Sequence, residues 1–174
     1  MMTREELLDK TEKIAHDFES TYHGCAQCVL GAFREILGKE FITDRIFRAG
    51  SGLCGGVGCS GHACGTVTAG LMVISLFHGR DFDDFQNTGK MMEGFKLGQP
   101  LIEKTKKEYG SINCYDIQEK ITGRHFECFS EEDQKEANEK YGLHTEICSK
   151  VVGKGARWTM EILIDKGFVN PKDF

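Results

Sequence analysis

The sequence predicts an all-α fold: a compact multi-helix bundle that forms a single domain over residues 1–174. Apolar residues recur at three- and four-residue steps along most of the chain, which is the period of an amphipathic helix. The 174 residues include only two prolines, and this scarcity favours long helices. No segment of useful length shows the alternation typical of a strand.

The N-terminal part is expected to form two helices and a short turn. An apolar stripe from Leu7 to Phe18 predicts the first helix, which Gly24 ends. A second stripe begins at Cys25 and ends at Gly38, a residue type common just after a helix. Residues 44–47 look like one helical turn.

A segment rich in glycine and cysteine follows. Eight glycines lie between residues 50 and 70, interleaved with Cys54, Cys59 and Cys64. Glycine permits backbone conformations that other residues resist, so we expect a loop to about residue 63. The loop leads into a helix from Cys64, CGTVTAGLMVISLFHG, which is apolar nearly all round and is therefore expected to be buried at the centre of the bundle.

The C-terminal half is expected to continue with a polar loop over residues 80–89, then a long helix over 91–109 that Pro100 would kink. A short helix over 114–121 and an acidic, exposed helix with Ser130 as its N-cap should follow. The last helix carries Cys148 in its first turns.

Composition excludes several classes of partner. The net charge of −5 lacks the basic footprint of a nucleic-acid-binding protein. No apolar run approaches the roughly 18–20 residues of a membrane span, so we expect no membrane insertion. The N-terminus, MMTREELLDKTEK, is charged where a signal peptide is apolar, which predicts a cytoplasmic protein. Long apolar helix faces that include many of the 12 phenylalanines leave room for a homodimer interface.

Eight cysteines are unusual for such a chain. A chain of this length without an export signal does not need disulfides to fold. Three explanations remain: metal or cluster ligation, redox-active thiols, and inert cysteines packed as small apolar side chains.

Four of the cysteines share one local context at the start of a predicted helix: Cys25, Cys64, Cys114 and Cys148. The positive end of the helix dipole can lower a thiol pKa well below its usual value of about 8.5 and so favour the thiolate, which binds metal and attacks disulfides. For any single one of these cysteines, a structural role explains the position as well as a functional role does. For all four together, a structural role is the weaker explanation. We therefore predict that these four sulfurs gather around one pocket.

The remaining cysteines carry weaker signals. Cys25 and Cys28 form a C-x-x-C pair, and Cys54, Cys59 and Cys64 at intervals of five resemble an iron–sulfur ligand loop. Cys128 is best explained as a bystander. Among the histidines only His62 has a position that suggests ligation, and a solvated loop histidine explains it better. The candidate metal ligands are Cys25, Cys28, Cys54, Cys59, Cys64, Cys114 and Cys148.

Four segments, GCAQCVLGAF, CGTVTAGLM, YGSINC and CSKVV, resemble in that order the C_GCAxxG_C_C family of redox-active proteins over about residues 10–160. By position, the resemblance implies that the four family cysteines are Cys25, Cys64, Cys114 and Cys148. Residues 64–69 depart from the motif, with threonine and alanine where alanine and glycine are typical. The family is also similar to split-Soret cytochromes, but the haem-attachment motif is absent here. The resemblance implies redox activity.

Three functional hypotheses follow. In the first, Cys25, Cys64, Cys114 and Cys148 bind an iron–sulfur or other metal cluster for electron transfer. In the second, Cys25 or Cys64 is a catalytic thiol that exchanges disulfides with a redox partner protein or a small-molecule thiol. In the third, the cysteines bind zinc in a structural interaction module. We favour the first, because eight cysteines exceed what a dithiol mechanism needs and a glycine-rich loop suits a cluster.

Overall fold

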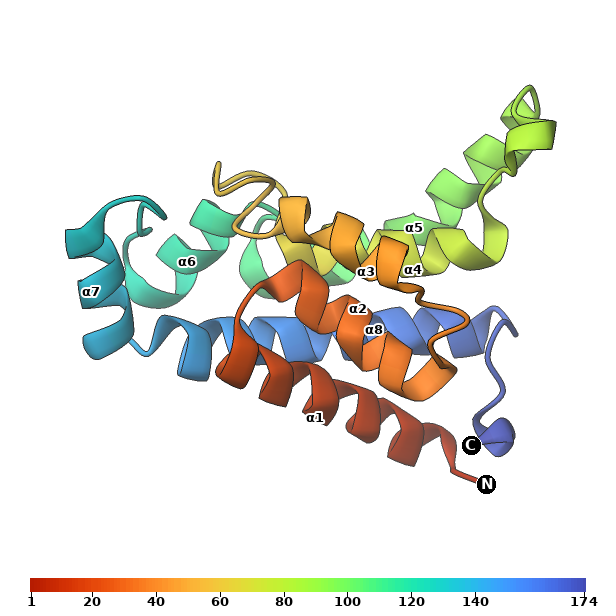
Figure 1. Cartoon of the computed structure of the whole chain (residues 1–174), viewed down its shortest axis with the longest axis horizontal. Coiled ribbons are helices and arrows are strands. Elements are labelled where there is room, and N and C mark those ends of the chain that lie inside the picture. Colours follow the sequence, from red (N-terminus) through yellow and green to blue (C-terminus); the bar gives the residue numbers. More distant parts are fainter.

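The structure is a computed structural model that describes residues 1–174, and it is a bundle of eight α-helices without a strand (Figure 1). The predicted all-α class is confirmed. The helices are α1 (Arg4–Tyr22), α2 (Cys25–Leu37), α3 (Asp44–Ala49), α4 (Gly65–His78), α5 (Thr88–Tyr109), α6 (Cys114–Thr122), α7 (Glu131–Glu139) and α8 (Ser149–Asp165). Short 3₁₀ turns lie at Gly50–Leu53 (η1), Phe82–Asp84 (η2) and Pro171–Asp173 (η4), and a π-helical turn, η3, spans Leu143–Cys148.

Helices α1 and α8 lie side by side in opposite directions, which brings the two chain ends to the same side of the molecule (Figure 1). Thr3 starts α1 with a capping box, in which its hydroxyl accepts from the Glu6 N–H and the Glu6 carboxylate accepts from the Thr3 N–H. Arg157 of α8 forms ion pairs with Asp9 at 2.6 Å and with Glu12 at 3.2 Å. These contacts hold the outer pair of helices together.

The core lies between α1, α2, α4 and α8. Phe33, Val73, Met160 and Leu163 are among its fully buried side chains. The expectation that the helix after the glycine-rich loop is buried and central is correct, since α4 packs against α2, α5 and α8. A Cβ atom at Gly155 would lie 2.0 Å from Cγ2 of Thr66, so glycine there allows the close approach of α8 to α4.

Some boundaries differ from those predicted. The first helix already begins at Arg4, and the predicted polar loop over 80–89 contains η2 and the first residues of α5, whose N-cap is Asn87. The long helix continues through Pro100. Cys148 is not inside α8 but ends η3, because Gly142 in a left-handed conformation starts a wider π-helical turn before α8.

The N-terminal part of α5 and η2 form an arm that extends from the bundle (Figure 1). The arm exposes four large apolar side chains: Phe82, Phe85, Met92 and Phe95. Nothing in the structure shows what covers them, so the homodimer interface stays a prediction. None of the helices is both long and apolar enough to span a bilayer.

Candidate functional site

The four cysteines singled out by their helix positions line one cavity of about 30 Å³. They come from four separate elements. Cys25 is the first residue of α2, Cys64 precedes α4 as its N-cap, Cys114 is the first residue of α6, and Cys148 ends η3. The rest of the wall is mostly aliphatic, formed by Ile117, Ile147, Val151 and Val152 with Thr66 and Gln118. The geometric expectation of one shared pocket therefore agrees with the structure.

A short antiparallel contact brings Cys64 and Cys114 together. Ala63 and Asn113 form an isolated β-bridge. The Cys64 N–H donates to the Ile112 carbonyl at 2.8 Å, and the Cys114 N–H donates to the His62 carbonyl at 2.7 Å. The glycine-rich segment is thus joined to the start of α6 through the backbone, and this contact sets the separation of the two cysteines.

Glycines make the close approaches possible. A Cβ at Gly65 would lie 2.5 Å from Sγ of Cys25, and one at Gly56 would lie 2.8 Å from Cβ of Cys114. Gly56 also has a φ of +74°, which a residue with a side chain rarely adopts. The glycine content of this segment therefore has two reasons, which are left-handed turns and direct contact with the cysteines.

The thiol of Cys25 forms hydrogen bonds with the sulfurs of Cys54 and Cys64. Hydrogen bonding with Cys54 and Cys64 raises the pKa of Cys25 well above the usual thiol value. The same hydrogen bonds from Cys25 lower the pKa of Cys54 to about 6 and that of Cys64 to about 7, against the opposing effect of burial. At neutral pH Cys25 is the proton donor of this trio, Cys54 is largely thiolate, and Cys64 is about half ionised.

The helix-start argument holds for Cys64, where the backbone N–H of Thr66 at the start of α4 helps to lower the thiol pKa. It fails for Cys25, because the backbone N–H groups of Ala26 and Gln27 in the first turn of α2 hydrogen-bond to Cys54 instead. Cys54 therefore receives the stabilisation that the sequence assigned to Cys25.

The helix-start argument also fails for Cys114 and Cys148. Burial raises the pKa of both thiols. For Cys148 the preceding turn is π-helical, so the residue does not lie at a free helix N-terminus. The amide of Gln118 donates to Sγ of Cys114 at 3.6 Å. Both thiols are neutral in the absence of a metal, and metal binding would displace their protons.

Cys59 and Cys128 form a second sulfur pair. A Cβ at Gly55 would lie 2.7 Å from Sγ of Cys59 and 3.2 Å from Sγ of Cys128. Burial, with a hydrogen bond to Cys59, raises the pKa of Cys128 to about 12. The sequence grouped Cys59 with Cys54 and Cys64 and left Cys128 as a bystander. No spacing signal could have linked residues so far apart.

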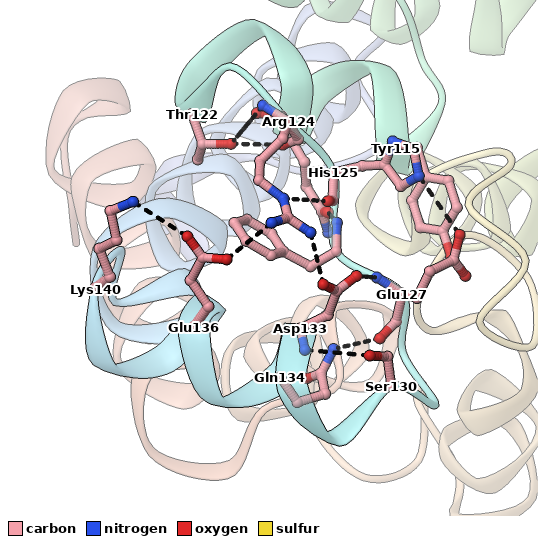
Figure 2. Close-up of polar contacts among 12 residues, drawn as sticks. Tyr115, Thr122, Arg124, His125, Glu127, Ser130, Asp133, Gln134, Glu136 and Lys140 are labelled. Atoms are coloured by element: carbon pink, nitrogen blue, oxygen red, sulfur yellow. Dashed lines mark hydrogen bonds and ion pairs between the residues drawn. The ribbon is translucent and has the colours of Figure 1, made fainter.

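A polar network holds the loop that carries Cys128 (Figure 2). Arg124 pairs with Asp133 at 2.6 Å and with Glu136 at 2.8 Å, which ties the loop to α7. On the other side, the Tyr115 hydroxyl donates to Glu127 at 2.9 Å and connects the loop to α6. Cys128 is thereby fixed against the glycine-rich segment.

Cys28 does not line the cysteine cavity. Its buried thiol donates to the backbone carbonyl of His23 at 3.2 Å, and burial raises its pKa. The C-x-x-C pair is therefore split, with Cys25 in the cavity and Cys28 toward the end of α1.

Beside Cys28 lies a cluster that the sequence gave no reason to expect: Glu19, His23 and His144, with one ligand atom from each within 4.8 Å of the others. Glu19 and His144 are 125 positions apart, so only the fold brings them together. His23 has a positive φ of 60°, which is rare for a residue with a side chain. His62, which the sequence best explained as a solvated loop histidine, is exposed and belongs to neither group.

The cysteine cavity fits a compact inorganic group. Organic ligands typically occupy pockets of roughly 300–1,000 Å³. The cavity of about 30 Å³ is far smaller, although it exceeds the roughly 10–15 Å³ that a water needs. Four thiols are soft donors that suit an iron–sulfur cluster or zinc.

Neither the curated proteins nor the solved structures contain a significant match to this chain. A family profile, described as "Putative redox-active protein (C_GCAxxG_C_C)", matches residues 5–162. The match spans nearly the whole bundle and includes all four cysteines of the cavity. The chain therefore belongs to the C_GCAxxG_C_C family of redox-active proteins.

Proposed function

We propose that the protein transfers electrons through an iron–sulfur cluster, or a comparable metal cluster, held by Cys25, Cys64, Cys114 and Cys148. One observation carries the proposal: four cysteines from four elements far apart in the sequence line a single small cavity. Scattered structural cysteines would not be expected to meet in this way.

The chain itself contributes ligands, hydrogen bonds and exclusion of water. A bound cluster would supply one-electron chemistry. The Gln118 amide at 3.6 Å from Sγ of Cys114 and the backbone N–H of Thr66 beside Cys64 are contacts of the type that tunes the potential of a cluster. The mostly aliphatic wall limits the access of solvent to the sulfurs, of which Cys64 is buried and the other three are partly exposed. The electron donor or acceptor would be a redox partner protein.

Thiol–disulfide exchange is the second candidate, favoured by the lowered pKa of Cys54, about 6, and of Cys64, about 7. One of these thiolates would attack a substrate disulfide, forming a mixed disulfide and releasing one substrate thiol. Cys25, after losing its proton, would then attack the protein sulfur and release the second thiol. The two electrons come from two protein thiols, which end as an intramolecular disulfide.

Anaerobic purification followed by iron, acid-labile sulfide and zinc analysis separates the hypotheses. We expect a brown protein with iron and sulfide. Both should be lost in Cys114→Ser and retained in the matched control Cys28→Ser, because Cys28 does not line the cavity.

A colourless sample without iron contradicts the cluster. Stoichiometric zinc in that sample would support a structural zinc site instead. A metal-free sample that forms a reversible disulfide among Cys25, Cys54 and Cys64 would support thiol exchange.

A further inference from the structure

The carboxylate of Glu19 lies buried at the end of α1 with one oxygen unsatisfied. Only 1% of its side chain is exposed. Oε1 lies 2.9 Å from Nδ1 of His144, the only ion-pair partner of Glu19, whereas Oε2 has no hydrogen-bond partner. Because a buried carboxylate oxygen without a partner is costly, it indicates a missing ligand.

Two imidazoles lie beside the Glu19 carboxylate. The rings of His23 and His144 are 4.3 Å apart, and one donor atom from each residue lies within 4.8 Å of the carboxylate. Nδ1 of His23 lies 3.0 Å from the backbone oxygen of Glu19. A histidine that bonds a carbonyl through one ring nitrogen and offers the other to a cation is the usual arrangement of metal-bound histidines.

We propose that Glu19, His23 and His144 form a second metal site, for a divalent first-row transition-metal cation. Two histidines and one carboxylate are the ligands of open zinc sites and of non-haem iron(II) sites, and a cation would satisfy Oε2 of Glu19. None of the three residues lines the cysteine cavity, so the site is separate from the proposed cluster.

The site also has an entry path. His23 and Cys28 line a second cavity, of about 420 Å³, together with Phe18, Tyr22 and Arg34. A metal site needs such access, and open coordination positions on the cation would face solvent or a small ligand in this cavity.

Anaerobic titration of the metal-depleted, reduced protein with Co²⁺ tests the site. We expect the protein to bind one equivalent of Co²⁺ at this site, which is measured by the visible d–d absorption of the bound ion. This binding should be lost in His23→Ala and His144→Ala. Glu19→Gln, which keeps the side-chain shape, should weaken its binding by more than the roughly 10–100-fold typical of changes outside the first ligand shell. The matched control is His78→Ala, because His78 is partly exposed and pairs with Glu93 at 3.0 Å without a third ligand.

Unchanged Co²⁺ binding in all three site variants would overturn the proposal, because the cation would then be bound elsewhere. Should the variants not fold, histidine-ring NMR of the unaltered protein decides. Zn²⁺ must shift the resonances of His23 and His144, and a spectrum in which these stay unchanged also overturns the site. The two proposals can fail independently. If Glu19→Gln retains iron and sulfide, the cluster is intact, and any loss of Co²⁺ binding in that variant concerns the second metal site alone.

Discussion

At the scale of single residues, the chemistry depends on how Cys25 divides its hydrogen bonding between two neighbours. A thiol has a single proton to donate, so Cys25 keeps that proton and stabilises the negative charge on whichever neighbouring sulfur accepts it. Accordingly, the pKa of Cys25 is raised while the pKa values of Cys54 and Cys64 are lowered. Cys54 is only half-buried, so it is the thiolate that a reagent reaches first.

Replacement of Cys25 by alanine should slow the alkylation of Cys54 at pH 6. With a pKa of about 6, about half of Cys54 is thiolate at this pH, whereas an ordinary thiol is under 1% ionised. Because Cys25 is the main cause of the lowered pKa, Cys25→Ala should reduce the rate roughly tenfold or more at pH 6, and higher pH should restore it.

Pulsed iodoacetamide labelling of the reduced, metal-free protein with peptide mass mapping measures this effect. Cys28→Ala is the control, since Cys28 forms no hydrogen bond with Cys54. Equal rates in Cys25→Ala and the unaltered protein would show that the two sulfurs do not share a proton.

At the scale of elements, the cavity is assembled by the contact between the glycine-rich segment and the start of α6, and by the close approach of α4 to α2. The Ala63–Asn113 bridge sets the first contact. Gly65 sets the second, because its missing side chain leaves room for Sγ of Cys25, the Ala26 nitrogen and the Leu53 oxygen. Two of these three atoms belong to the backbone and cannot rotate away.

Gly65→Ala should therefore lower both the stability and the metal content. Overpacking costs about 1–3 kcal/mol, and the better helix propensity of alanine recovers at most about 1 kcal/mol. We expect the free energy of unfolding to fall by about 1–2 kcal/mol, with less iron per protein. Urea denaturation and iron analysis check the two effects.

Gly52→Ala is the matched control in the same segment, because a Cβ there would meet nothing within 4 Å. It should change stability by no more than about 0.5 kcal/mol. A Gly65→Ala protein with the stability and iron content of this control would refute the close-contact argument.

At the scale of the whole molecule, the bundle core and the cysteine cavity overlap only at their border, where Val152 belongs to both and Cys25 packs against the core. Phe33, Met160 and Leu163 belong to a large core between α1, α2, α4 and α8. Cys64 belongs instead to a smaller cluster with Tyr109 and Ile117. Stability and metal binding should therefore respond to different substitutions.

Met160→Ala should destabilise the fold and leave metal binding intact. Met160 is fully buried, and such truncations cost about 2–5 kcal/mol. At about 2–4 °C per kcal/mol for a chain of this size, the melting temperature should fall by roughly 5–20 °C. Iron per folded protein, measured below the new melting temperature, should not change. Loss of iron from the folded Met160→Ala protein would show that the cysteine cavity depends on packing at Met160.

The sequence by itself was sufficient to predict the helices and to select the four cysteines that line the cavity. Stripes such as that of Cys25 to Leu37 are local, and so are the glycines that end them. Cys25, Cys64, Cys114 and Cys148 could be selected because each lies at an element boundary with a recurring local pattern.

Only the tertiary structure decided how the other groups combine. Cys54 joins Cys25, Cys59 joins Cys128, and Glu19 meets His144 across 125 positions. It also decided which thiols ionise, because α2 directs its free N–H groups at Cys54 rather than at Cys25. The reason is physical: helix periodicity depends on neighbours in the chain, whereas the pKa of a thiol and the composition of a metal site depend on which elements pack together.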